Sequence, residues 1–361
     1  MPVICSCKEN LKLFAGGYTG GNAKGLFVYD FSLRDGTLEM VSNVDAGSNP
    51  AFFCFSGKHK LIYVLNEVKE FNGNPGGGIT TLKYDSDNGR FEKLNEILVP
   101  YGGPCYISVS PGNDFLLVAN YGSGSVAVVK LGKDGIPESI AHSILYETKA
   151  PDVSHPHMIS HDPAGKRVYV TDLGLDRIMV YDLDNSTGKL IAVNNGVVDL
   201  PEGSGPRHFT FNSDGSKMYV INELGSTTMV FDVNDKECLK LLQTSKTMQT
   251  DFKGKNYCAD IHLGKDGKYL YGSNRGENNI VIFKIEEDGL LSSAGYVSCG
   301  GDWPRNFAIA PSGNFLLVGN QRSDQISVFK INNKTGIPEG PVANTGIKAP
   351  ACLKFYNFNG N

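Results

Sequence analysis

Six charged or ionisable side chains stand at two fixed positions of a repeated segment. The first group directly follows a proline and the second directly follows an asparagine: His157, Arg207 and Arg305, then Glu67, Glu223 and Arg275. An imidazole can act as a general base near neutral pH. Guanidinium groups bind carboxylates, phosphates and developing oxyanions. These residue types are suited to acid–base chemistry if the fold brings them together.

The proline-type and asparagine-type positions, here called the first and second marks, occur together six times. Within each repeat the second mark lies sixteen residues after the first. The first mark is Pro50, Pro104, Pro156, Pro206, Cys258 or Pro304, and the second is Asn66, Asn120, Asp172, Asn222, Asn274 or Asn320. Successive second marks are separated by 54, 52, 50, 52 and 46 residues. A repeat of this length contains one supersecondary unit, which is too small to bury a core alone. The 361 residues therefore predict one domain of stacked units.

Each repeat has the pattern of several short strands. In the last full repeat, apolar residues alternate over 307–309, a turn covers 311–314, and further apolar runs cover 315–318 and 326–331. Alternation of this kind is typical of strands, and the Gly/Pro/Asp clusters between the runs indicate tight turns. One turn signal recurs as Asp35-Gly36, Asn88-Gly89, Asp134-Gly135, Thr187-Gly188 and Asp288-Gly289. Four antiparallel strands without a helical pattern predict a β-propeller blade.

The two ends of the chain supply a seventh blade. Residues 349–355 have the pattern of a first strand, whereas 11–18 and 25–30 have that of a second and a third strand. We therefore predict that the N- and C-termini share one blade, which removes an exposed sheet edge. The predicted fold is an all-β, seven-bladed β-propeller over residues 11–361, with residues 1–10 as an N-terminal extension.

The predicted register places both groups at one rim of the ring. The first strand of each blade begins where the second ends, because the two strands form an antiparallel hairpin. One column of the rim reads Ala51, Cys105, His157, Arg207, Ala259, Arg305, Ala351, and the other reads Tyr18, Glu67, Tyr121, Leu173, Glu223, Arg275, Gln321. We expect the charged members to surround the channel mouth. They form either a site or a belt of ion pairs that stabilises the rim.

The remaining histidines and the marks have simpler expected roles. His155 is expected at the mouth, and His161 further along its strand. His208 should point away from Arg207, because neighbouring residues on a strand alternate faces. The asparagine-type marks are expected to cap their turns by bonding the backbone two residues on. No histidine or acidic set has metal-ligand spacing, so we predict neither metal nor cofactor.

Composition argues against several classes of function. The net charge of −4 and the absence of a Lys/Arg run disfavour a nucleic-acid partner. No stretch approaches the roughly 18 apolar residues of a membrane span. The first residues lack the basic and apolar regions of a signal peptide, so a cytoplasmic location is expected. The eight scattered cysteines are expected to be free, buried thiols. Neither a Gly-x-Ser-x-Gly elbow nor a phosphate-binding loop is present.

Short motifs along the whole chain resemble one family. They are Gly-Gly-Tyr-Thr (16–19), Asn-Glu (66–67), Ala-Asn-Tyr (119–121), His-Pro-His (155–157), Asp-Leu-Gly-Leu-Asp-Arg (172–177), Gly-Pro-Arg-His (205–208), Asn-Glu-Leu (222–224), Ser-Asn-Arg-Gly (273–276) and Pro-Arg-Asn-Phe (304–307). The chain resembles the seven-bladed propeller lactonases. That family contains the bacterial propeller-type 6-phosphogluconolactonases, and the fungal carboxy-cis,cis-muconate cyclase is related to them.

The resemblance implies a site at the predicted rim. Residues proposed as functional in the family fall on His157, Arg207, Glu223 and Arg275, which we predict to be catalytic. The predicted substrate-binding residues are Arg305, Glu67, Tyr121, His155 and Gln321. The implied reaction is hydrolysis of a sugar-acid lactone, most simply 6-phospho-D-glucono-1,5-lactone of the pentose phosphate pathway. His157 or Glu223 would be the base, either nearby arginine would stabilise the oxyanion, and Arg305 would bind phosphate.

Two other functions remain open at this point. An intramolecular lyase that cyclises a carboxylated muconate would use the same side chains, with the arginines holding substrate carboxylates. A non-enzymatic propeller that binds a peptide or protein would present aromatic residues at the rim, where Tyr18, Tyr121 and Trp303 are candidates. For the enzyme, the expected partner is a small phosphorylated or carboxylated lactone, and the expected state is a monomer or weak dimer.

Overall fold

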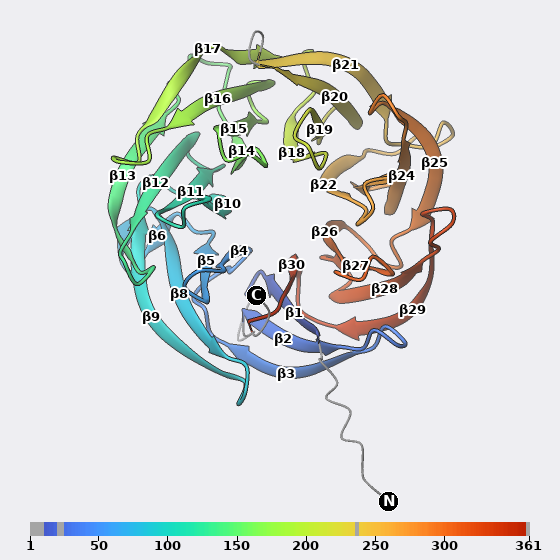
Figure 1. The fold of residues 1–361 in the computed structure, drawn as a ribbon, viewed down its shortest axis with the longest axis horizontal. Coiled ribbons are helices and arrows are strands. Elements are labelled where there is room, and N and C mark those ends of the chain that lie inside the picture. Colours follow the sequence, from blue (N-terminus) through green and yellow to red (C-terminus); the bar gives the residue numbers. More distant parts are fainter. Residues whose placement is uncertain (1–10, 20–24, 235–237, 359–361) are drawn as a thin grey trace, which may run out of the picture.

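Seven four-stranded antiparallel sheets of the described residues are arranged in a ring (Figure 1), and side chains of the innermost strands line a central channel. The computed structural model describes residues 11–19, 25–234 and 238–358. Every regular element in these ranges is a strand, so the prediction of an all-β, seven-bladed propeller is confirmed. One blade carries an added hairpin, β6 (Glu70–Phe71) with β7 (Asn74–Pro75), between its second and third strands.

The strands fall into four concentric sets. The innermost strands are β4 (Phe52–Ser56), β10 (Pro104–Val109), β14 (Pro156–His161), β18 (Pro206–Phe211), β22 (Tyr257–Leu263), β26 (Pro304–Ile309) and β30 (Pro350–Tyr356). The second strands are β1 (Leu11–Gly17), β5 (Leu61–Asn66), β11 (Phe115–Asn120), β15 (Arg167–Asp172), β19 (Lys217–Asn222), β23 (Tyr269–Arg275) and β27 (Phe315–Asn320).

The outer half of each blade is formed by the other two sets. The third strands are β2 (Leu26–Phe31), β8 (Gly77–Asp85), β12 (Ser125–Leu131), β16 (Arg177–Leu183), β20 (Thr227–Asn234), β24 (Asn279–Ile285) and β28 (Gln325–Ile331). The outermost strands are β3 (Leu38–Val44), β9 (Arg90–Val99), β13 (Pro137–Leu145), β17 (Leu190–Asp199), β21 (Cys238–Lys246), β25 (Leu291–Ser298) and β29 (Pro338–Gly346).

The two ends of the described chain share one blade, as predicted. Its strand order is β3-β2-β1-β30, so the last strand of the chain is the innermost strand of this sheet. The pairing runs from Lys12 opposite Tyr356 to Gly16 opposite Cys352. β30 thereby covers the inner edge of β1, which would otherwise be a template for aggregation.

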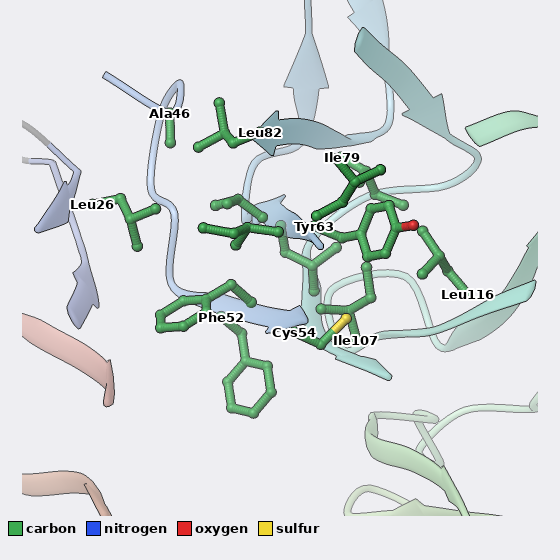
Figure 2. Packing of buried hydrophobic residues seen from close by; sticks show 14 of the residues in the cluster. Leu26, Ala46, Phe52, Cys54, Tyr63, Ile79, Leu82, Ile107 and Leu116 are labelled. Carbon is green, nitrogen blue, oxygen red and sulfur yellow. The ribbon is translucent and has the colours of Figure 1, made fainter. Parts of the chain in front are cut away.

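Apolar residues of the inner three strands fill the space between neighbouring blades. Figure 2 shows one such region, where Phe52, Tyr63, Ile79 and Leu116 belong to the same buried cluster. The tyrosine hydroxyl also donates a hydrogen bond of 2.6 Å to the carbonyl of Gly135, in the next blade. The same hydrogen bond between neighbouring blades occurs twice more. The Tyr219 hydroxyl donates to the Gly289 carbonyl at 3.0 Å, and the Tyr271 hydroxyl donates to the Gly336 carbonyl at 2.7 Å. The repeated glycine turns thus serve both as hairpins and as acceptors between blades.

The Asn and Asp side chains at the second mark are fully buried, and their hydrogen bonds reach beyond the turn that follows each of them. Asp172 behaves as predicted, since its carboxylate accepts from the backbone N–H of Gly174, two residues on. The asparagines mostly donate instead to the loop that enters the blade or to its third strand. Asn66 donates to the Ala46 carbonyl at 2.7 Å, and Asn222 to the hydroxyl of Thr227 at 2.9 Å. The prediction of a purely local cap is therefore wrong for most of them.

The described cysteines match the prediction of free, buried thiols. They are Cys54, Cys105, Cys238, Cys258, Cys299 and Cys352. Cys5 and Cys7 lie outside the described residues, as does the predicted extension over residues 1–10. Within the described ranges, no helix has the length and apolar character needed to cross a membrane.

Candidate active site

β-Bulges change the direction of the side chains in the first column. In β18 the register pairs residue 206 with 222 and residue 208 with 221, so Arg207 is the extra residue. The same irregularity occurs at His157 in β14 and at Arg305 in β26. A bulge interrupts strand alternation and re-aims a side chain. Arg207 Nη1 lies 3.4 Å from His208 Nε2, so the prediction that these neighbours point apart is wrong.

Glu223 joins two buried arginines in one cluster. Its Oε2 atom lies 2.9 Å from Arg207 Nε and 2.6 Å from Arg275 Nη2. The Arg207 Nε contact lacks hydrogen-bond geometry, so it acts as an ion pair only. The arginine side chains are 3% and 5% exposed, and that of Glu223 is 17% exposed. One carboxylate between two guanidinium groups leaves the cluster with an excess of positive charge.

Backbone carbonyls of β22 fix both arginines in place. Arg207 Nη1 donates to the carbonyl of Ala259. Arg275 Nε donates to Tyr257 at 3.2 Å and its Nη2 to Cys258 at 3.1 Å. Burial and the neighbouring Arg207 lower the pKa of Arg275 to about 9, although Glu223 opposes the shift. Arg275 is therefore still a cation at neutral pH, and its orientation is set before any substrate binds.

His157 lies beside this cluster as a neutral imidazole. It is buried, and burial followed by the positive charge of Arg207 holds its pKa well below the usual value. Arg305 and Arg275 act in the same direction. Within the described residues, its Nδ1 atom has no hydrogen-bond partner. A neutral ring with an unoccupied nitrogen can accept a proton or bind a substrate hydroxyl.

Arg305 belongs to a second charged group with different contacts. Its guanidinium carbon lies 5.2 Å from the centre of the Tyr18 ring, and the Tyr18 hydroxyl donates to Glu67 Oε2 at 2.8 Å. Among the described residues, Arg305 makes no ion pair or hydrogen bond through its guanidinium group. Burial disfavours its charge, but the surrounding Tyr18, Glu67 and Glu223 outweigh burial and raise its pKa. Arg305 is thus a charged group whose donors are available to a ligand.

Three other predicted substrate-binding residues lie around His157 and the rim. The Tyr121 ring stacks on His155 with ring centres 4.4 Å apart and meets the His157 ring edge-on at 5.6 Å. His155 Nδ1 also lies 2.8 Å from the Tyr121 carbonyl. Gln321 donates its backbone N–H to Trp303 at 3.0 Å, and its buried Oε1 has no partner among the described residues. Tyr121 and His155 are therefore part of the group around His157, whereas no side-chain hydrogen bond within the described residues joins Gln321 to it.

Two aromatic side chains of the rim, Trp303 and Tyr18, pack against arginines. The guanidinium carbon of Arg322 lies 3.3 Å from the centre of the Trp303 ring, and that of Arg275 lies 5.4 Å from it. Tyr18 is covered by Arg305 in the same manner. The rim is consequently a mixed surface of cations and aromatic rings, not a continuous apolar patch of the kind that marks protein interfaces.

Sequence reasoning missed a buried carboxylate beneath the arginines. Asp260 accepts a hydrogen bond from His208 Nδ1 at 2.8 Å and another from His262 Nε2 at 2.8 Å. Asp260 follows Ala259, a member of the first column, and the register in β22 is also irregular at this point. The sequence does contain a signal for this contact. His208 and Asp260 occupy the same position in successive repeats, directly after a member of the first column.

The thiols closest to the site are not candidates for nucleophiles. Cys105 Sγ lies 3.4 Å from the His157 carbonyl, and Cys258 Sγ lies 3.1 Å from the Thr247 hydroxyl. Burial raises the pKa of each to about 12, so both are protonated at neutral pH. In the described part of the chain, no three His, Cys, Asp or Glu side chains are grouped so that they could hold a metal ion.

Fold and site together define a propeller in which a histidine lies among arginines at the rim where the innermost strands begin and the second strands end. The family model described as "Lactonase, 7-bladed beta-propeller" matches residues 12–355. This match covers almost the whole chain, so the protein belongs to the seven-bladed β-propeller lactonase family, as the sequence motifs predicted.

Relatives of this chain include proteins with named lactonase activities. A 6-phosphogluconolactonase of Formosa agariphila is 32% identical over 360 residues, which is 96% of this chain and all of that protein. A 6-phosphogluconolactonase of Bacillus subtilis is 26% identical over 350 residues, covering 95% of this chain and 98% of the relative. The solved structure of a periplasmic gluconolactonase of Pseudomonas aeruginosa has a TM-score of 0.90 at 31% identity, covering 96% and 99% of the two chains.

Proposed function

We propose that this protein hydrolyses 6-phospho-D-glucono-1,5-lactone to 6-phosphogluconate, a step of the pentose phosphate pathway. The observation that carries the proposal is the neutral His157 beside two arginines fixed by Glu223, with Arg305 left free for an anion. Named relatives act on this lactone or on its unphosphorylated counterpart. Opening a lactone with water requires a base, a stabilised oxyanion and a group that orients the substrate, and each has a candidate here.

His157 is proposed as the base that activates water. Its lowered pKa keeps the ring neutral, so it can take a proton as the water oxygen bonds to the lactone carbonyl carbon. When the bond from this carbon to the ring oxygen breaks, the same imidazolium can return the proton to the departing oxygen. The products are a carboxylic acid, which ionises, and a free hydroxyl group. Glu223 is less suited to this role, because protonation of its Oε2 would break two ion pairs.

Arg207 and Arg275 are proposed to stabilise the oxyanion. Charge develops on the carbonyl oxygen during attack, and donors already oriented toward it give the largest single contribution to many hydrolytic rates. Carbonyls of β22 and the Glu223 carboxylate fix both guanidinium groups. The site therefore needs little reorganisation when the charge appears.

Arg305 is proposed to hold the phosphate. Its guanidinium has no ion pair among the described residues, and Tyr18 packs on one face of it. A planar fork that binds two phosphate oxygens would also fix the distance between the phosphate and the reacting carbonyl. Because a phosphate dianion does not cross a membrane unaided, this substrate also implies the cytoplasmic location.

The test is a comparison of substrates with purified protein. The rate of lactone opening above spontaneous hydrolysis is measured for 6-phosphogluconolactone and for glucono-1,5-lactone, and cyclisation is followed with a carboxymuconate. We expect the highest kcat/KM with the phosphorylated lactone. Faster turnover of the muconate would contradict the proposal in favour of the lyase, and inactivity on all three would favour a binding protein.

A further inference from the structure

Asp260 is a buried carboxylate for which the proposed chemistry has no direct use. Its side chain is 4% exposed, in β22. Oδ1 accepts from His208 Nδ1 at 2.8 Å, and Oδ2 accepts from His262 Nε2 at 2.8 Å. Oδ2 also accepts from the side-chain amide of Asn306 and from the backbone N–H of Phe307 at 3.3 Å. Four donors from three blades converge on one anion, and no lysine or arginine of the described ranges forms an ion pair with it.

The bond to Asp260 determines which nitrogen of His208 carries the proton. A carboxylate accepts only, so His208 Nδ1 must be the donor, and in the neutral ring Nε2 then carries the lone pair. Burial, with Arg207, lowers the pKa of His208 to about 4 even though Asp260 opposes the shift, so the neutral ring is the relevant form. The Nε2 lone pair lies 3.4 Å from Arg207 Nη1, which can donate to it.

His208 therefore connects the buried carboxylate to two proposed catalytic groups. It faces the Nη1 atom of Arg207, whose other acceptor is the carbonyl of Ala259. The His208 ring also meets the His157 ring edge-on, with ring centres 5.1 Å apart. Tyr106 also meets the His208 ring edge-on, with ring centres 5.3 Å apart. A ring flip at His208 would present a C–H to Arg207, and a change of tautomer would present an N–H, so either would remove the lone pair that Arg207 faces.

We propose that Asp260 is a positioning residue, which acts through the orientation and tautomer of His208 to hold Arg207 and His157 in their reactive arrangement. The inference rests on the proposed function for its kinetic test. It deepens that function by extending the site one layer below the channel mouth and across the interface between the blades of β18 and β22.

His262 offers a matched control within the same cluster. It donates to the same carboxylate over the same 2.8 Å, but its side chain is 43% exposed and its ring packs against Phe307. Both His262 and Asp260 line a channel cavity of about 630 Å³, which lies among the inner strands. Among the described residues, no hydrogen bond, ion pair or ring contact joins His262 to Arg207 or His157. Replacing His262 therefore removes a hydrogen bond to Asp260 of the same length as that from His208, but leaves the contacts of Arg207 unchanged.

The experiment measures kcat and KM for 6-phosphogluconolactone in Asp260→Asn, His208→Leu and His262→Leu. We expect about a tenfold loss of kcat in the first two with KM changed less than about twofold, in line with outer-shell positioning groups elsewhere. His262→Leu should retain more than half of wild-type kcat. The Asp260→Asn/His208→Leu double variant should be no worse than either single variant, because both changes break one connection.

His208→Gln serves as the conservative variant and as a safeguard if Asp260→Asn does not fold. Glutamine can offer an amide donor to Asp260 and a carbonyl oxygen to Arg207, so it should recover kcat relative to His208→Leu. Equal losses in His208→Leu and His262→Leu, additive losses in the double variant, or no recovery with glutamine would overturn the inference.

Nitrogen-15 NMR of the histidine and arginine side chains separates this inference from the proposed function. In the wild type, His208 should show the tautomer protonated at Nδ1. Asp260→Asn should change that signature and shift the Arg207 Nε–H signal, whereas His262→Leu should change neither. Lactonase failure with these NMR results would reject the proposed function only. Unchanged His208 and Arg207 signals in Asp260→Asn would reject the inference whatever the activity.

Discussion

Two carboxylates at the channel mouth are held in opposite ways. Glu223 is bound by the guanidinium groups of Arg207 and Arg275, at 2.9 and 2.6 Å. Glu67 instead accepts a hydroxyl hydrogen bond from Tyr18, and the nearby Arg305 has no ion pair among the described residues. The first arrangement fixes two cations before a substrate arrives, and the second leaves one cation available. This difference fits the proposed roles. Arg207 and Arg275 would stabilise the negative charge that develops during the reaction, and Arg305 would bind a negative charge that the substrate already carries.

The largest effect is expected from removing a fixed cation. Arg275→Ala should lower kcat/KM for the lactone by about 100-fold, because a pre-oriented donor to the oxyanion is lost. Steady-state kinetics measures the loss, and circular dichroism checks the fold. Arg177→Ala is the control, since this arginine forms an exposed ion pair with Asp199 on a surface. Turnover of Arg275→Ala close to that of Arg177→Ala would remove Arg275 from the site.

The two carboxylates should respond unequally to the same substitution. Glu223→Gln should lower kcat about tenfold, because two buried guanidinium groups then repel each other without a counter-charge. Glu67→Gln should change kcat less than about threefold, since an amide oxygen can still accept from Tyr18. Both variants are measured side by side for kcat and for thermal stability. Equal losses in the two variants would erase the distinction between the clusters.

The available cation should act on binding. Arg305→Ala should raise KM for 6-phosphogluconolactone about tenfold with a smaller change in kcat, because a phosphate contact present in the ground state is removed. The same variant should treat glucono-1,5-lactone almost as the wild type does. A similar loss with both lactones would mean that Arg305 does not recognise phosphate.

Much of this arrangement follows from the repeat, and some of it does not. The marks and turn glycines predict the blades, the shared seventh blade and the rim columns that contain His157 and Arg275. The β-bulge at Arg207 is invisible to strand alternation, so the contact with His208 was predicted wrongly. Asp260 was missed because three of its four partners, His208, Asn306 and Phe307, come from other blades, and only the tertiary packing brings them together.

The pH dependence of catalysis should lack an inflection at an ordinary histidine value. His157 has to be neutral to accept a proton, and burial and nearby cations hold its pKa well below 6.5. The activity is present above the folded-state pKa and lost only as pH falls through it. We therefore expect kcat/KM to be flat between pH 6 and 7.5 after correction for spontaneous opening. A loss centred near pH 6.5 would point to a different, unperturbed base.

A smaller effect is expected on stability at mildly acidic pH. Burial lowers the pKa of His161 and of His208 to about 4, so the unfolded chain binds protons that the native state excludes. The native state is then favoured above the unfolded value near 6.5 and loses stability as pH falls toward 4, by at most about 1.4 kcal/mol per pH unit for each histidine. Urea denaturation at several pH values measures the slope, which His161→Gln should reduce. An unchanged slope in that variant would show that His161 is not excluded from protonation.

The most direct test of the account is the rate at which 6-phosphogluconolactone opens above its spontaneous rate, for the wild type beside His157→Ala. We expect clear acceleration by the wild type and loss of most of it in the variant, with the fold preserved. No acceleration by the wild type, or full activity in His157→Ala, would contradict it.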